Sequence, residues 1–140
     1  MPILYRAQAS VSGGRAGRAR SSDGVLDVEL AVPKALGGPG GAATNPEQLF
    51  AAGYAACFDG SLQFLVGLKK LAGVNTSVTA DVGVGPGDGA PGFVLDVELT
   101  AHVAGLPREE AEALVAEAHA VCPYSKALAG NVDVRLTVVT

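Results

Sequence analysis

Residues 45–58 read Asn45-Pro-Glu-Gln-Leu-Phe-Ala-Ala-Gly-Tyr-Ala-Ala-Cys57-Phe58. This stretch predicts the start of a long helix, because Asn45 suits the N-cap, Pro46 the first helical position and Gln48 the partner position of a capping box. The residues that follow are apolar almost all round, and a helix of that kind is buried on most sides. We expect it to run to Leu71.

The segments on either side of this helix predict a sheet. Five of them alternate apolar and polar residues with a period of two, which is typical of half-buried strands. They are 3–11, 26–32, 78–84, 93–103 and 132–138. Clean alternation favours antiparallel sheet with one face in water. A second helix is predicted from Pro107 to Cys122, with one apolar face. The order of elements predicts an α+β fold.

Length and composition narrow the class of protein. The 140 residues are 49% hydrophobic and 17% charged, which predicts one globular domain over residues 1–140. The net charge of -4 argues against a nucleic-acid partner. No signal peptide is visible, and the longest apolar run, 49–58, is about half the ~20 residues that span a membrane. We therefore expect a cytoplasmic protein with reduced thiols.

A single sheet with one wet face cannot surround a helix that is apolar on all sides. We therefore expect a second copy of the chain to complete its burial, and predict a homodimer.

Cys57 and Cys122 are the only cysteines of the chain, 65 positions apart. A thiol alone in an apolar helix has a raised pKa and is inert, so a reactive Cys57 needs a fixed positive charge nearby. Arg15 or Arg18, in the glycine-rich segment 13–18, could supply it, and Glu47 could hold the guanidinium through a bidentate pair. Glu47 lies ten residues before Cys57, about 15 Å along a straight helix. An extended Arg15 could span part of that distance; otherwise the site must draw residues from both subunits, or the helix must be irregular.

Cys122 is predicted at a helix C-terminus, where the helix dipole disfavours a thiolate. Such a thiol suits the second step of a redox cycle. In that cycle Cys57 attacks a peroxide and becomes a sulfenic acid, Cys122 condenses with it to a disulfide, and an external dithiol restores both. Apolar neighbours would favour an organic hydroperoxide over hydrogen peroxide. The expected neighbours are Leu49, Phe50, Tyr54, Phe58 and Phe93.

The residues leave other readings open. Cys57 could simply fill a gap between helices, since free cysteine is often buried. His119, Cys122, Cys57 and His102 formally make a zinc set, although their spacing matches no finger or ribbon pattern. A cysteine–histidine hydrolase is possible from residue types, but no orienting acid or nucleophile-elbow motif supports it.

Two long motifs resemble the organic hydroperoxide resistance family, Ohr, a branch of the Ohr/OsmC superfamily. They are Thr44-Asn-Pro-Glu-Gln-Leu-Phe-Ala-Ala-Gly-Tyr-Ala-Ala-Cys57-Phe and Ala118-His-Ala-Val-Cys122-Pro-Tyr-Ser125, the latter followed by Gly130-Asn-Val-Asp-Val134. Gly13-Gly-Arg-Ala-Gly-Arg18 and the Gly-Pro-Gly…Gly-Phe93 segment match as well, so the resemblance covers nearly the whole chain. The Cys122-Pro-Tyr-Ser segment points to Ohr rather than to its OsmC relatives.

The resemblance implies a thiol peroxidase that reduces alkyl and fatty-acid hydroperoxides, with no bound cofactor or metal. It implies an intertwined α+β homodimer in which two sheets wrap central helices. Cys57 matches the peroxidatic cysteine, Cys122 the resolving one, Arg15 the activating arginine and Glu47 its carboxylate partner. The implied reductant is a lipoyl dithiol on a lipoylated protein.

In one place the chain departs from the family pattern. Residues 126–129 are Lys-Ala-Leu-Ala, where the family usually has an Asn-Ala-Thr-Arg-like stretch. This difference affects the surface near Cys122, where a reductant would dock.

The alternative from another class is a non-catalytic OsmC-like dimer that binds a ligand or senses redox state.

Overall fold

The computed structural model describes residues 1–89 and 91–140. They form two compact units, Met1–Leu49 and Phe50–Thr140. The α+β class expected from the sequence is confirmed by two three-stranded sheets and their helices. A single domain over residues 1–140 stays a prediction.

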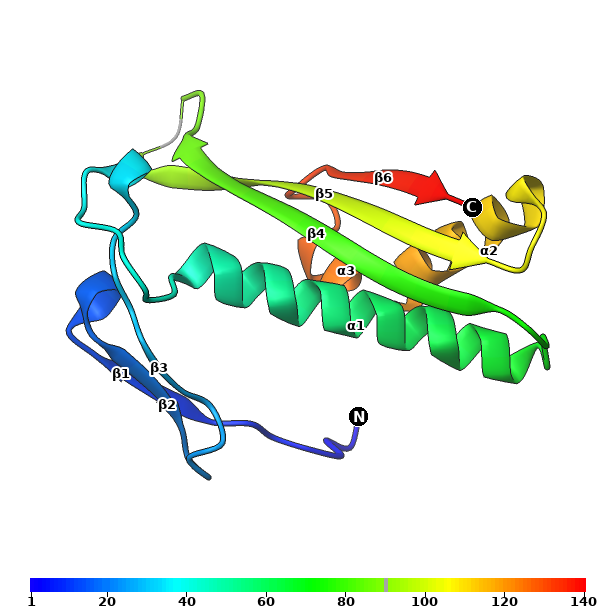
Figure 1. Cartoon of the computed structure of the whole chain (residues 1–140), viewed down its shortest axis with the longest axis horizontal. Helices are drawn as coiled ribbons and strands as arrows, with labels where there is room; N and C mark the ends of the chain where they lie inside the picture. The colour runs from blue at the N-terminus through cyan, green and yellow to red at the C-terminus, as the bar shows by residue number, and fades with distance from the viewer. Residues whose placement is uncertain (90) are drawn as a thin grey trace. The chain divides into compact units, whose positions relative to one another are not determined.

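The first unit contains an antiparallel sheet of three short strands (Figure 1). The strands are β1 (Ala9–Ser12), β2 (Arg18–Ser21) and β3 (Asp27–Glu29), and two single turns of 3-10 helix follow β1 and β3, η1 (Gly14–Ala16) and η2 (Lys34–Leu36). The strand predicted over 3–11 was wrong for its first part, since β1 begins only at Ala9. β2 was missed because its four residues bury only Ala19 and carry two arginines.

The second unit holds a three-stranded sheet in the order β4-β5-β6, with helices packed against one face (Figure 1). Its elements are β4 (Asn75–Pro86), β5 (Phe93–Ala104), α2 (Arg108–Val121), α3 (Pro123–Leu128) and β6 (Val134–Val139). The long helix α1 (Pro46–Leu68) begins in the last residues of the first unit and continues through the second. β4 and β5 pair antiparallel along their whole length, and the segment that joins them includes Ala90, which is outside the described residues.

The second sheet is mixed rather than antiparallel throughout, which corrects the sequence prediction. β6 pairs parallel with β5, from Val97 opposite Val134 to His102 opposite Val139. The cause is the helical crossover through α2 and α3, which returns the chain to the end of the sheet at which β5 started. The alternation of apolar and polar residues along β6 indicates that one face of the strand is in water, and it does not predict the direction in which the strand runs.

The start of α1 follows the prediction at Asn45 and departs from it at Gln48. Asn45 Oδ1 accepts the backbone N–H of Gln48 at 2.8 Å, as an N-cap should. The Gln48 side chain does not complete a capping box, because its Oε1 accepts the Thr44 hydroxyl at 2.7 Å. The helix ends at Leu68, three residues before the predicted end, and Lys70 then turns into the left-handed region with φ 53°.

The core of the second unit lies between the inner face of β5 and the buried stripes of α1 and α2. Its most enclosed side chains are Tyr54, Phe58, Leu62, Val97, Leu99, Val103, Val115 and Cys122. The other face of α1 remains exposed in the single chain, with Phe64 63% and Leu68 66% accessible. By length and composition alone α1 could cross a membrane, a test that core helices of soluble proteins also pass.

Candidate active site: a reduced cysteine pair

Cys57 and Cys122 meet inside the second unit, as the sequence predicted for a redox pair. Both are free thiols, and Cys122 donates toward Cys57 with their Sγ atoms 3.6 Å apart. A disulfide needs about 2.05 Å between the sulfurs, so the pair must close by only about 1.5 Å. Bond formation therefore requires local adjustment and no movement of whole elements.

The two thiols differ in access because of the elements that carry them. Cys57 lies near the middle of α1 and is half-buried, whereas Cys122 is 0% exposed. Cys122 has the extended backbone angles φ -64° and ψ 124°, so it ends α2 and begins α3 at a sharp corner. A molecule from solution can reach the sulfur of Cys57 before that of Cys122.

The second unit does not by itself make Cys57 a good nucleophile. Burial raises the pKa of the Cys57 thiol, the backbone N–H of Tyr124 opposes this by hydrogen-bonding the sulfur, and the neighbouring Cys122 raises it further. The balance lies above the ordinary thiol value. A thiolate at Cys57 thus needs a further positive charge.

Aromatic side chains line the cysteine pair, as expected. Phe50 packs edge-on against Tyr54 with ring centroids 6.1 Å apart, and Tyr124 lies 5.8 Å from Tyr54. Phe58 is fully buried one residue after Cys57. Phe93 does not join this cluster, since it is 63% exposed and lines a separate cavity. The predicted neighbour Leu49 belongs to the first unit.

The predicted arginine–carboxylate pair forms in the first unit. Arg15 donates to Glu47 through both terminal nitrogens, at 2.9 Å and 2.6 Å. The Arg15 hydrogen bond is the main reason that the pKa of Glu47 is lowered, and the same bond raises that of Arg15. The pair leaves the Arg15 side chain 40% exposed, so its planar guanidinium is oriented and still accessible.

Glycines shape the turn that presents Arg15. Gly13 has φ 84°, a left-handed angle that other residues rarely adopt. A Cβ on Gly17 would lie 1.6 Å from the carbonyl oxygen of Ser12, so only glycine fits there. These two residues close η1 tightly around Arg15, which explains the glycine-rich segment seen in the sequence.

Arg18 does not share this arrangement. Its Nε donates to Asp27 at 2.6 Å across the β2–β3 pair, and its Nη1 lies 3.5 Å from Glu29. Of the two arginines proposed from the sequence, Arg15 is the one that binds Glu47. Because Arg15–Glu47 and Cys57–Cys122 lie in different units, their joint action stays a prediction.

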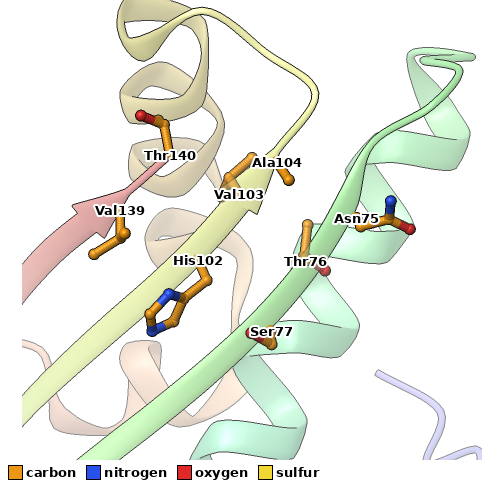
Figure 2. Close-up of a pocket in the computed structure, with 8 residues that line it drawn as sticks. All are labelled: Asn75, Thr76, Ser77, His102, Val103, Ala104, Val139 and Thr140. Atoms are coloured by element: carbon orange, nitrogen blue, oxygen red, sulfur yellow. The ribbon is translucent and has the colours of Figure 1, made fainter.

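The histidines do not form the zinc set considered from the sequence. His119 Nδ1 lies 2.8 Å from the Ser125 hydroxyl. His102 lies on the exposed face of the second sheet, where it lines a hollow of about 300 Å³ together with Ser77 and Val139 (Figure 2). Within residues 1–89 and 91–140, no three His, Cys, Asp or Glu side chains gather in a way that could hold a metal ion.

Sequence reasoning missed two groups beside the cysteines. The backbone N–H of Tyr124 contacts the Cys57 sulfur, and the Ser125 hydroxyl lies 2.6 Å from Tyr54 Oη. A backbone donor leaves no trace in the sequence. Ser125 could have been noticed, since it follows Cys122 by three residues within a motif that was quoted.

Comparisons with known proteins agree with this geometry. The family described as OsmC-like protein matches residues 38–137, a stretch that contains both cysteines. The fold and the paired thiols thus define a protein of the OsmC-like class.

Within that class, the chain belongs to the organic hydroperoxide resistance family. It is 51% identical over 135 residues to the organic hydroperoxide resistance protein of Xanthomonas axonopodis pv. citri, covering 96% of this chain and 94% of that one. It is 49% identical to the organic hydroperoxide resistance protein OhrA of Bacillus subtilis, with 96% of each chain covered. A crystal structure of an organic hydroperoxide resistance protein from Legionella pneumophila superposes with a TM-score of 0.94 at 50% identity, over 99% of this chain and all of the other.

Proposed function

We propose that this chain is a thiol peroxidase that detoxifies organic hydroperoxides by reducing them to alcohols. The observation that carries the proposal is that two free thiols lie 3.6 Å apart, the half-buried Cys57 and the fully buried Cys122. Aromatic side chains pack around them. The names of the relatives, organic hydroperoxide resistance proteins, support the same substrate class.

The first step takes place at Cys57. Its thiolate attacks the terminal oxygen of the hydroperoxide, the O–O bond breaks, and the alkoxide leaves and takes a proton to become the alcohol. Cys57 is then a sulfenic acid. Alkyl and fatty-acid chains suit this site because Phe50 and Tyr124, which are not fully buried, offer apolar surface to the organic part of the substrate.

The second step uses Cys122. Its sulfur attacks the sulfenic sulfur, hydroxide leaves and takes the thiol proton to form water, and the Cys57–Cys122 disulfide results. The short distance between the sulfurs supports this step. A dithiol then reduces the disulfide by two exchanges, and we propose a lipoyl group on a lipoylated protein as that dithiol. No bound cofactor or metal enters the cycle.

Activation of Cys57 is assigned to Arg15, held by Glu47. The raised pKa of Cys57 within its own unit means that a cation must be brought to it, and Arg15 is bidentately oriented with 40% of its side chain accessible. The arginine can come from the same chain or from a second copy.

A homodimer is part of the proposal. The apolar helix α1 leaves Phe64 and Leu68 largely exposed in the single chain, and an exposed stripe of this kind on a long core helix fits a second copy of the same surface. Light scattering on purified protein at several concentrations tests this, and a monomer at all of them would contradict it.

One experiment separates a peroxidase from a ligand-binding or redox-sensing relative. The reduced protein receives one equivalent of an alkyl hydroperoxide, and free thiols are counted after denaturation. Loss of both thiols per chain, with one alcohol formed, is expected. If both thiols remain free, the proposal fails.

The order of the roles is tested with two variants. Cys122→Ser is expected to consume one equivalent of hydroperoxide and then over-oxidise at Cys57, while Cys57→Ser is inert. Equal reactivity of the two would contradict the assignment.

A further inference from the structure

Three polar side chains form a chain of hydrogen bonds inside the second unit. Tyr54 Oη and Ser125 Oγ are 2.6 Å apart, and Ser125 Oγ lies 2.8 Å from His119 Nδ1. Tyr54 is 0% exposed and Ser125 is 3% exposed. Enclosed polar groups of this kind hold their neighbours in a fixed arrangement, because leaving any of them without a partner is costly.

The three residues connect the segments that carry the two cysteines. Tyr54 precedes Cys57 by three residues on α1, and His119 and Ser125 stand three residues before and after Cys122. The bond between His119 and Ser125 therefore closes the α2–α3 corner at whose apex Cys122 lies. The bond from Tyr54 fixes that corner to α1, one helical turn from Cys57.

The same corner is fitted to α1 by packing at Tyr124. Its ring lies 6.3 Å from that of Phe50, and a Cβ on Gly53 would come within 3.2 Å of its hydroxyl. Its backbone N–H bonds the Cys57 sulfur. A shift of α3 along α1 would thus move Cys122 away from Cys57.

Ser125 is the centre of the network. A hydroxyl donates once and accepts twice, so Ser125 can donate to one of its two neighbours and accept from the other, or accept from both Tyr54 and His119. Every arrangement needs the serine oxygen. Burial raises the pKa of Tyr54, which keeps its hydroxyl protonated and able to donate.

We propose that Ser125, together with Tyr54 and His119, is the positioning element that holds Cys122 in line with Cys57 for disulfide formation. This rests on the proposed function for its biological meaning, since it concerns the resolving step of that cycle. The residues touch neither substrate nor reacting sulfur. They act by keeping the corner at Cys122 docked on α1.

The test uses a thiol probe rather than a peroxide, so that it is independent of the peroxidase chemistry. Reduced protein is mixed with 4,4′-dithiodipyridine in a stopped-flow instrument. The Cys57 thiolate attacks the probe disulfide and releases one thiopyridone. Cys122 then attacks the Cys57 sulfur of the mixed disulfide, loses its proton to solvent and releases the second thiopyridone.

Two variants perturb the network to different degrees. Ser125→Ala removes the centre, and Tyr54→Phe removes a single oxygen while keeping the ring that packs on Tyr124. The second release is expected to slow about tenfold to a hundredfold in Ser125→Ala and less in Tyr54→Phe, because misplacement of a reacting group by about 1 Å costs on that order. The first release should stay within about threefold of the wild type, since the probe meets Cys57 first.

Ser61→Ala is the matched control. Ser61 is also an enclosed serine, 9% exposed, but its hydroxyl donates to the Cys57 backbone carbonyl at 3.1 Å and takes no part in the network. Its second release should match that of the wild type, and Ser125→Thr, which keeps the hydroxyl, should recover part of the lost rate. Circular dichroism confirms that each variant is folded.

An unchanged second release in both Ser125→Ala and Tyr54→Phe overturns the inference, as does an equal loss in Ser61→Ala. The outcome for the proposed function is separate. A wild type that resolves the probe but consumes no hydroperoxide leaves the positioning role standing and refutes the peroxidase. A wild-type peroxidase whose variants resolve at full rate refutes the positioning role alone.

Discussion

Oxidation of Cys57 and Cys122 to a disulfide is expected to stabilise the folded chain. The bond would close a loop of 65 residues. In the chain-entropy relation such a loop removes about 14 cal/mol/K from the unfolded state, or about 4 kcal/mol at 25 °C. The sulfurs must close by about 1.5 Å from 3.6 Å beside packed side chains, which subtracts from that gain.

We therefore expect the oxidised form to exceed the reduced form by about 2–4 kcal/mol in free energy of unfolding. For 140 residues this corresponds to a rise of about 7–14 °C in Tm. The assay is urea denaturation, with the reduced form kept in a phosphine and the oxidised form made with one equivalent of oxidant. Protein concentration is held equal, because a dimer gains apparent stability with concentration.

Cys57→Ser carried through the same two treatments is the control, and its two curves should coincide because this variant is expected to be inert. A wild-type protein whose oxidised form is no more stable to urea than its reduced form would refute the reasoning. It would mean that the thiols are not poised for bonding and that the disulfide strains the corner between α2 and α3.

Three further predictions concern the Arg15–Glu47 pair of the first unit and the core of the second. Arg15→Ala is expected to raise the pKa of Cys57 further and to slow its oxidation by at least about tenfold. Arg18→Ala, which makes the same change of charge beside β3, should leave the oxidation rate within about twofold. Iodoacetamide alkylation against pH measures the pKa, stopped-flow measures the oxidation rate, and equal effects of the two variants would contradict the role of Arg15. Because the Arg15 bond lowers the pKa of Glu47 below its ordinary 4.5, the pair is intact at neutral pH and is lost only as pH falls through the lowered value. The oxidation rate divided by that of Glu47→Gln should therefore hold steady near neutral pH and fall towards one only in acid below the ordinary carboxyl value, and a ratio that already falls near neutral pH would contradict this. Leu99→Ala, at a position 0% exposed in the core, should cost about 2–5 kcal/mol of stability in urea melts without changing thiol stoichiometry, and a cost under about 1 kcal/mol would contradict the packing described.

The sequence predicted those elements whose pattern is set by burial. The alternation at 93–103 became β5, whose inner residues are buried from Val97 to Val103, and the apolar stripe predicted for the second helix lies on α2, Arg108–Val121. Prediction from the sequence failed where the length of a strand or the direction of its pairing was the question. β2 is too short for a period to show, and the parallel pairing of β6 depends on a crossover rather than on its own residues.

The site was predicted to the same extent and for similar reasons. Motifs identified Cys57, Cys122, Arg15 and Glu47, and the structure brings them together as two pairs. It could not be read from the sequence that Gln48 turns to Thr44, or that Ser125 links Tyr54 to His119, because such bonds depend on side-chain rotamers fixed by packing.

The immediate surroundings of the sulfurs favour the proposed redox pair over two cysteines that only fill a gap. A gap needs only volume, and a small apolar residue would serve. Here the Tyr124 N–H and the Cys122 thiol both donate toward one sulfur, that of Cys57. The Cys122 thiol donates toward the sulfur of Cys57, which is the more exposed of the two, so this contact fits Cys57 as the thiol that meets the peroxide and Cys122 as its partner. The opposite assignment would require peroxide to reach Cys122, which is 0% exposed. The difference in exposure between the two thiols therefore supports the proposed order, in which Cys57 reacts first.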